Sequence, residues 1–414
     1  MQFATDWNAM NGWQRALLAL VCGVAVASIY AAQPVLEPMG SDLGISGSHA
    51  GWMVAAAQLG YLAGLILLVP LGDVVADRRG LIAAHLALIA AALILTATAQ
   101  AAWVAFTALA ATGVVAVVVQ TTVAYAASVS PPAERGRNIG VVTAGVVVGI
   151  LGARVVTGAL ADLWGWRSVY GMLAALALAL ATVVLVAMPS PERPISVGYR
   201  EAVITLGGLF GQRNFLTHGL IAFFLFASFG TLWSGYAVAL TDVPWQLSES
   251  QIGLFGVAGL VGALGAARAG RWADAGGAET VTATALGLLL VSWEAIAQLP
   301  HSLWLLALGI VLLDFAVQAV HVSNQHILSA GYPDRVSTVI GGYMVFYALG
   351  SALGAAATTA VFTAYGWAAS GLLGAGFAVG ALIVWRFGTR RPQDQPSTEN
   401  ERRRVELPCG AQGD

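Results

Sequence analysis

Long apolar stretches recur along the whole of this 414-residue chain and leave few folds open to it. Each stretch is long enough to cross a hydrocarbon layer about 30 Å thick, which takes about 20 residues of α-helix. Hydrophobic residues make up 58% of the chain and charged residues only 10%, which is typical of a multi-pass membrane protein. We place twelve spans, at 15–34, 49–71, 82–99, 102–129, 138–160, 168–188, 215–240, 250–270, 279–299, 303–329, 337–363 and 369–387.

The basic residues fall almost entirely on one side of these spans. All 19 are arginine, and 17 of them lie in the N-terminus, the even-numbered connections and the C-terminal end. The other side holds Arg167 alone, and Arg154 lies within a span. Positive residues stay on the cytoplasmic side of a membrane. The pattern therefore predicts an even number of spans, both termini in the cytoplasm, and a bacterial inner membrane as the location.

Composition and spacing also exclude several classes of protein. The net charge of −2 argues against a nucleic-acid partner, and Cys22 and Cys409 are too far apart in the topology to form a disulfide framework. The sequence has no cysteine–histidine spacing for a metal, no phosphate-binding loop, and no nucleophile with a base beside it. We therefore expect a protein that is not an enzyme, binds no cofactor or metal, and takes its energy from an ion gradient.

The connection 189–214 divides the spans six and six. It is the longest connection and holds Pro189, Pro191 and Pro194 with mixed charge. This predicts an N-terminal bundle over 1–188, a cytoplasmic linker over 189–214 and a C-terminal bundle over 215–387. The polar tail 388–414 is expected to be disordered and cytoplasmic.

The two bundles share landmarks when the chain is shifted by 201 residues. The clearest coincidence is a Gly-Trp pair, Gly165-Trp166, which falls on Gly366-Trp367. Parallel six-helix repeats with a substrate path between them are one way to build a transporter. The fold class we predict is an all-α membrane protein with twelve transmembrane helices in two six-helix pseudo-symmetric halves.

Several loops resemble those of the major facilitator superfamily. The connection from Pro70 to Gly80 is similar to the family's Gly-x-x-x-Asp-Arg loop, with the second acid one position late, and 270–276 fits the pattern better. Arg135-Gly136-Arg137 and Gly165-Trp166-Arg167 also resemble the family, over almost the whole chain. The short linker is similar to that of the twelve-helix drug:proton antiporter branch.

Charged residues in two of these loops suggest a cytoplasmic latch between the halves. Acidic residues recur in both loops, whereas membrane topology alone requires only the arginines. The alternative is that the loops serve topology alone. The candidate gate or latch residues are Gly72, Asp73, Asp77, Arg78, Arg79, Arg135, Arg271 and Asp274.

A polar stripe on the tenth span is the strongest functional signal. Asp314, Gln318, His321 and Gln325 recur at helical spacing, with Asp314 near the bilayer midplane. An ionisable group there is costly unless it is paired or hydrated, so we expect it to face an internal cavity. Asp and His are also the groups suited to carrying a proton. The alternative is a structural hydrogen-bond network between helices.

Two other ionisable residues lie within spans. Arg154 follows Gly145, Gly149 and Gly152 on the fifth span, whose small residues allow close packing. The antiporter branch has Gly-Pro where this chain has Ala153-Arg154, and it has an arginine in the fourth span, near Leu109, where this chain has none. We interpret Arg154 as the fixed cation in its place, either pairing with a carboxylate or receiving an anionic substrate, unless its side chain simply reaches the periplasmic face. The candidate proton-coupling residues are Asp314, His321, Arg154 and Glu294, although Glu294 lies close enough to the periplasmic end to reach water.

The substrate contacts implied by the family resemblance come from spans 1, 4, 7 and 10, with parts of 5 and 11. An aromatic wall with few charges suits an amphipathic or aromatic solute. The alternative for each aromatic residue is packing within the bundle. The candidate substrate-binding residues are Tyr30, Gln33, Gln120, Thr121, Tyr125, Phe229, Trp233, Gln318, Gln325, Tyr343 and Tyr347.

These observations predict a secondary active transporter that works by alternating access. Proton-coupled export of a small amphipathic or aromatic compound is the function we expect, by a monomer embedded in the lipid bilayer with small-molecule substrate and protons as its partners. Two alternatives stay open: a proton-coupled importer or uniporter of a small metabolite, and a transporter-like membrane sensor or channel.

Overall fold

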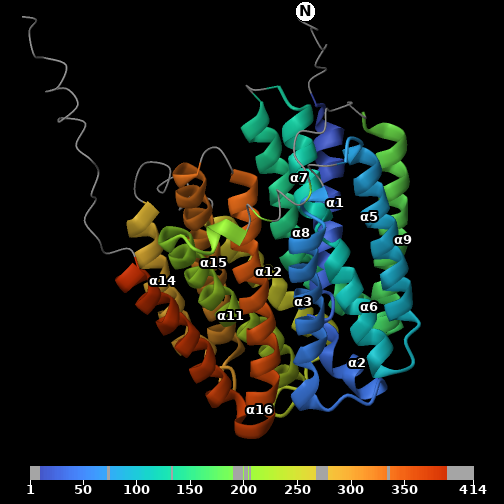
Figure 1. The fold of residues 1–414 in the computed structure, drawn as a ribbon. Coiled ribbons are helices and arrows are strands. Elements are labelled where there is room, and N and C mark those ends of the chain that lie inside the picture. Colours follow the sequence, from blue (N-terminus) through green and yellow to red (C-terminus); the bar gives the residue numbers. More distant parts are fainter. Residues whose placement is uncertain are drawn as a thin grey trace, which may run out of the picture.

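The computed structural model describes residues 10–71, 75–131, 134–189, 199, 204, 207–266, 278–332 and 336–388. Within these ranges the chain is helical apart from its turns, and no strand forms. The helices run side by side in two groups, α1 to α9 on one side and α11 to α16 on the other (Figure 1). We call these groups the N half and the C half.

Six of the predicted spans form the N half. Its first span is bent, because the helix runs to Tyr30, passes through a short 3-10 turn at Gln33–Val35 and continues to Asp42. Its fourth span is interrupted at Ala116 and Val117. The elements are α1 (Gly12–Tyr30), η1 (Gln33–Val35), α2 (Leu36–Asp42), η2 (Gly47–His49), α3 (Gly51–Leu67), α5 (Arg78–Ala97), α6 (Ala102–Val115), α7 (Val118–Val129), α8 (Arg135–Trp164) and α9 (Trp166–Ala187).

The other six spans form the C half. Its elements are α11 (Arg213–Thr241), α12 (Glu249–Gly265), α14 (Ala278–Ile296), α15 (Leu303–Gly331) and α16 (Val336–Gly388). The backbone at Gly366 is not helical, so the 53 residues of α16 are two helices joined at a sharp turn. The short α12 and the two parts of α16 bring the described helices to the predicted twelve spans, all apolar enough for a membrane.

The sharp turn at Gly366 has a counterpart 201 residues earlier. Gly165 and Gly366 have positive φ angles of 77° and 76°, a conformation that a side chain disfavours. Each is followed by a buried tryptophan whose indole N–H donates a hydrogen bond, Trp166 to Asp42 Oδ2 and Trp367 to the Ile296 carbonyl. The Gly-Trp coincidence in the sequence therefore marks the same turn in both halves, in agreement with the predicted two-half arrangement.

The largest contacts between the two halves lie along two helix pairs, α3 with α16 and α8 with α12. A Cβ atom on Gly51 of α3 would lie 1.9 Å from the Ala355 carbonyl oxygen of α16, so the helices approach there as closely as glycine allows. The Gly51 amide donates to Thr359 Oγ1 at 3.1 Å, and the Ser250 amide donates to Asp162 Oδ2 at 3.3 Å. We call this end of the molecule, which also carries the Gly165 and Gly366 turns, the closed end.

The opposite end carries the N-terminus and most of the arginines, and we call it the arginine-rich end. Arg15 lies 3.9 Å from Glu134, Arg78 donates to the Ala124 carbonyl and Arg79 to that of Met188. Arg213 donates to the Phe387 carbonyl in the C half. Each of these contacts stays within one half. Most of the predicted linker 189–214, and the predicted tail beyond Gly388, lie outside the described residues.

Candidate functional site

Arg154 is buried at the centre of the molecule, with 1% of its surface exposed. It projects from α8, and its Nη2 donates to Gln33 Oε1 at 2.6 Å while its Nη1 donates to the Ile150 carbonyl. The guanidinium lies 3.7 Å from the ring centre of Trp233, which comes from the C half. A guanidinium over an aromatic face is stabilised by the ring quadrupole. Arg154 is therefore held by an amide and an aromatic ring rather than reaching toward water.

Asp314 lies beside this cluster on α15 and is also buried, with 1% of its surface exposed. Gly259 of α12 brings the groups together: a Cβ there would lie 2.7 Å from Trp233 and 3.1 Å from Asp314 Oδ2. Among the residues that the structure describes, Asp314 Oδ2 has no hydrogen-bond partner and no arginine within ion-pair distance. A carboxylate buried in this way is much more costly than a carboxylic acid.

His321 belongs to a second polar group, two turns further along α15 toward the arginine-rich end. His321 Nδ1 and the Tyr343 hydroxyl hydrogen-bond at 3.0 Å, and Gln325 Nε2 lies 3.0 Å from His321 Nε2. The spacing along α15 thus brings Gln325 next to His321, and Tyr343 of α16 joins them. Asp314 points instead to the Arg154 group, and Gln318 lies half-buried between the two.

A layer of aromatic rings from both halves separates the two polar groups. Phe226 contacts His321, Tyr347 and Phe229, with ring centres 5.2, 4.1 and 6.0 Å away. Tyr30 of the N half packs edge-on against Phe229, and its hydroxyl bonds to that of Tyr347 in the C half. The predicted aromatic wall therefore also forms a contact between the two halves.

Of the remaining predicted site residues, Gln120 is linked to the aromatic layer through Tyr61, whose ring centre lies 6.4 Å from that of Tyr347, whereas Tyr125 and Glu294 lie apart from it. Gln120 donates from the half-buried face of its helix to the Tyr61 hydroxyl at 2.6 Å, and the neighbouring Thr121 is buried. The Tyr125 hydroxyl donates to the Pro189 carbonyl at 2.6 Å, near the arginine-rich end. Glu294 is exposed on α14, separate from Asp314.

Only part of the predicted latch falls in the described chain. Gly72, Asp73, Arg271 and Asp274 lie outside the described residues. Asp77 caps α5 by accepting from the Gly80 amide at 3.0 Å, and Arg135 begins α8 as an exposed residue. Arg78 and Arg79 contact carbonyls of their own half. The latch therefore stays a prediction.

Two residues at the aromatic layer were not among the predicted site residues. Gln58 of α3 is buried beside the Tyr30 hydroxyl, together with Ser351 of α16. Gln58 is a lone amide in an apolar span, which is a signal that the sequence contains. Ser351 follows Gly350 in a span rich in small residues and gives no such signal.

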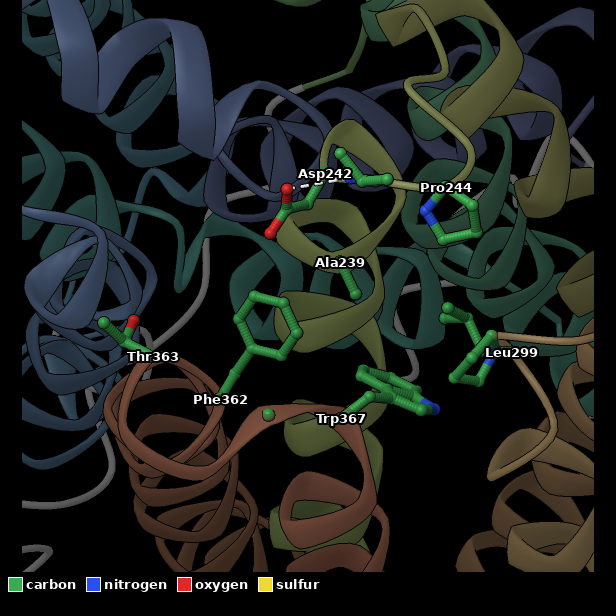
Figure 2. A pocket seen from close by; sticks show the side chains of 10 residues that line it. Ala239, Asp242, Pro244, Leu299, Phe362, Thr363 and Trp367 are labelled. Carbon is green, nitrogen blue, oxygen red and sulfur yellow. Dashed lines mark hydrogen bonds between the residues drawn. The ribbon is translucent and has the colours of Figure 1, made fainter.

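A separate cavity of about 530 Å³ lies at the closed end of the C half (Figure 2). It is lined by Ala239, Asp242, Val243, Pro244, Leu299, Pro300, Phe362, Thr363, Gly366 and Trp367. Its one carboxylate, Asp242, accepts a hydrogen bond from the Val243 amide at 2.8 Å. None of the predicted site residues lines this cavity, so it is distinct from the buried ionic groups.

Comparisons with known proteins agree with this architecture. The Major Facilitator Superfamily profile matches residues 18–243 and 220–411. The uncharacterized transporter YgaY of Escherichia coli O157:H7 is 38% identical over 91% of this chain and 96% of its own length. A chloramphenicol resistance protein of Streptomyces lividans is 30% identical over 90% of this chain and 95% of its own length.

A solved structure shows the same fold. A bacterial homologue of the human lysosomal transporter Spinster, in an inward-facing and occupied conformation, superposes with a TM-score of 0.75 at 16% identity, covering 91% of this chain and 95% of that one. With the profile match over both halves, these likenesses show that the chain belongs to the Major Facilitator Superfamily and is a multi-pass membrane transporter.

Proposed function

We propose that this transporter is a proton-coupled exporter of a small amphipathic or aromatic compound. The proposal rests on Asp314, which is buried between the halves with an oxygen that no described residue hydrogen-bonds. An acidic group at such a depth is inexpensive when protonated and costly when ionised, unless it is hydrated or paired. Asp314 is therefore suited to gain and lose a proton as its surroundings change.

We infer the route of the compound from which end of the molecule is closed. Gly51 and Ser250 join the halves there. With the arginine-rich end in the cytoplasm, the end that is shut in this arrangement is the periplasmic one. In the proposed cycle the halves rock, so that the closed end opens to the periplasm.

The aromatic layer supports an aromatic or amphipathic substrate. Phe226, Phe229 and Tyr347 offer rings rather than charges next to the ionic groups. The likeness to a chloramphenicol resistance protein favours export of a toxic aromatic compound. We place the protein in a bacterial inner membrane as a monomer with both termini in the cytoplasm, and the loops of the predicted latch would act at the cytoplasmic end.

Transport in proteoliposomes tests the proposal. A panel of solutes, including chloramphenicol and tetraphenylphosphonium, is offered under an imposed pH gradient. An exporter that exchanges substrate for protons should accumulate its substrate in an acidic lumen, because each proton that leaves drives substrate inward. Asp314→Asn imitates the protonated acid permanently. It should abolish this accumulation while substrate binding and downhill exchange continue.

Other outcomes would contradict the proposal in distinct ways. Accumulation in an alkaline lumen would indicate a proton symporter, and flux that does not saturate would indicate a channel. Accumulation at the wild-type rate by Asp314→Asn would make Asp314 structural. If Glu294→Gln or a His321 substitution then abolished accumulation, coupling would belong to that residue.

A further inference from the structure

Four polar side chains meet where α3 of the N half packs against α16 of the C half. The Tyr30 and Tyr347 hydroxyls hydrogen-bond across the halves. Gln58 and Ser351 lie beside the Tyr30 hydroxyl, one from each half. We call Gln58 and Ser351, with these two tyrosines, the amide junction. It lies two turns of α3 from Gly51, where the closed end begins.

Gln58 is unusual because most of its amide is unused. The side chain is fully buried, with 0% of its surface exposed, and neither its Nε2 nor its Oε1 makes a well-aligned hydrogen bond to a described residue. The Tyr30 hydroxyl beside it already bonds to Tyr347 and can pair with one amide atom at most. The Ser351 hydroxyl is likewise buried and unpartnered. Two other glutamines near the centre differ: Gln33 accepts from Arg154, and Gln120 donates to Tyr61. Buried polar groups are almost always hydrogen-bonded, so a mostly unused amide requires an explanation.

A structural role does not explain Gln58. If the amide served only to pack α3 against α16, an apolar side chain of the same size would pack as well without the loss of hydrogen bonds to water. The position of Gln58 explains why an amide is present, because the side chain lies at the contact between the halves beside the aromatic layer. A group that enters this contact would find donors and acceptors already in place.

The missing partner is an uncharged group. The Gln58 amide offers both a donor and an acceptor, and the Ser351 hydroxyl offers either, which matches an amide or a hydroxyl. No acidic side chain belongs to the junction, and the guanidinium of Arg154 lies 5.6 Å from the ring centre of Tyr30. A cation placed at the junction would therefore lack a counterion and would face Arg154 in a buried site, which is costly. A carboxylate would leave the Gln58 carbonyl oxygen without a donor.

We propose that Gln58 and Ser351 form a subsite for an uncharged amide or hydroxyl group of the transported compound. This inference rests on the proposed export function and adds a chemical requirement to it: the compound carries a neutral hydrogen-bonding group as well as an apolar body. Because one residue comes from each half, a compound bound to both holds the halves together. Substrate binding then favours the state in which the closed end is shut.

Binding to the full-length protein in nanodiscs tests the subsite with two probes. Chloramphenicol is an uncharged aromatic compound with an amide and two hydroxyls. Tetraphenylphosphonium is an aromatic cation with no hydrogen-bonding group. Gln58→Leu should weaken chloramphenicol binding by about 10- to 100-fold, the factor expected for an unpaired buried polar group. It should leave tetraphenylphosphonium binding within about two-fold and the melting temperature unchanged or higher.

Two further variants complete the test. Ser351→Ala should weaken chloramphenicol binding in the same direction. Thr112→Val is the matched control, because that buried hydroxyl already donates to the Ala108 carbonyl of its own helix; it should leave both affinities unchanged.

Three results would overturn the subsite. One is that Gln58→Leu leaves chloramphenicol binding unchanged, another is that it weakens both probes equally, and the third is that the wild type binds the cation but not chloramphenicol. In each case pH-driven accumulation of tetraphenylphosphonium would show that the proposed export function survives. If no solute accumulates under the pH gradient, the proposed export function is refuted, whatever Gln58→Leu does to binding.

Discussion

The contact of Gly51 with α16 predicts a single substitution that opens the closed end. In Gly51→Ala the new methyl would lie 1.9 Å from the Ala355 carbonyl oxygen and 2.6 Å from Thr359 Oγ1. Favourable contacts begin at about 3.5 Å, so α3 and α16 must separate by roughly 1.5 Å. Both contacted residues belong to the C half. Rocking the halves apart therefore relieves the clash without unfolding either half.

The size of the shift follows from the cost of overpacking. Inserting a methyl into a well-packed contact costs about 1–3 kcal/mol, which changes the ratio of closed to open molecules by about 5- to 150-fold. Spin labels measure the change. Ser46 and Tyr365, exposed at the closed end, should move apart, and Ala16 and Asn214, exposed at the arginine-rich end, should approach each other.

Two other glycines provide matched controls. A Cβ on Gly60 would lie 2.0 Å from the Ala110 carbonyl oxygen, but both helices belong to the N half, so Gly60→Ala should lower the melting temperature without moving the halves. Gly171 has nothing within 4 Å, and Gly171→Ala should do neither. In every labelled variant Cys22 and Cys409 are first replaced. The reasoning is refuted if Gly51→Ala loses stability like Gly60→Ala while both label distances stay at the wild-type values.

Three further predictions follow from the charges and the turns. A reporter fused after Arg391 should read cytoplasmic and one inserted near Gly47 periplasmic; a periplasmic reading at the C-terminus would reverse the orientation. Arg154→Lys should reduce transport at least tenfold while the protein still inserts, because an ammonium cannot keep the flat contact with Trp233; wild-type flux in the variant would show that this contact is dispensable. Gly165→Ala should lower stability by about 1–3 kcal/mol, because only glycine adopts that backbone conformation freely, with substrate affinity unchanged; an unchanged melting temperature would contradict this.

Hydropathy predicted the spans because a membrane requires long apolar helices, but it did not predict where those helices bend. The first span was placed at 15–34, and the chain continues beyond it through a 3-10 turn to Asp42. The span 102–129 was predicted as one helix and is interrupted at Ala116 and Val117. Neither change alters the apolar character that hydropathy measures. The turn at Gly366 was predicted, because it lies between the spans placed at 337–363 and 369–387.

From the sequence, contacts in the candidate site could be predicted only between residues that the helical spacing brings together on one helix. Spacing alone places Gln325 one turn from His321, and the two are indeed in contact. Helical spacing also places Asp314 on that face. In the structure Asp314 is separate from His321, because its neighbours come from α8 and α12. Gln58 was missed for the same reason: its neighbours on α16 are almost 300 residues away in the chain, and no periodicity within α3 identifies them.

The arrangement around Arg154 explains how a buried acid can change its charge without disrupting the site. Arg154 has its own partners in Gln33, the Ile150 carbonyl and the Trp233 ring, none of which changes charge. An arginine that depended on an ion pair with Asp314 would lose that partner each time the acid took up a proton, and a buried unpaired cation is costly. Because Arg154 is held independently, it stays in place as a fixed positive charge while Asp314 is free to alternate. Gly259 makes room for this arrangement, since a Cβ there would lie 2.7 Å from the Trp233 ring and 3.1 Å from Asp314 Oδ2 and would displace them.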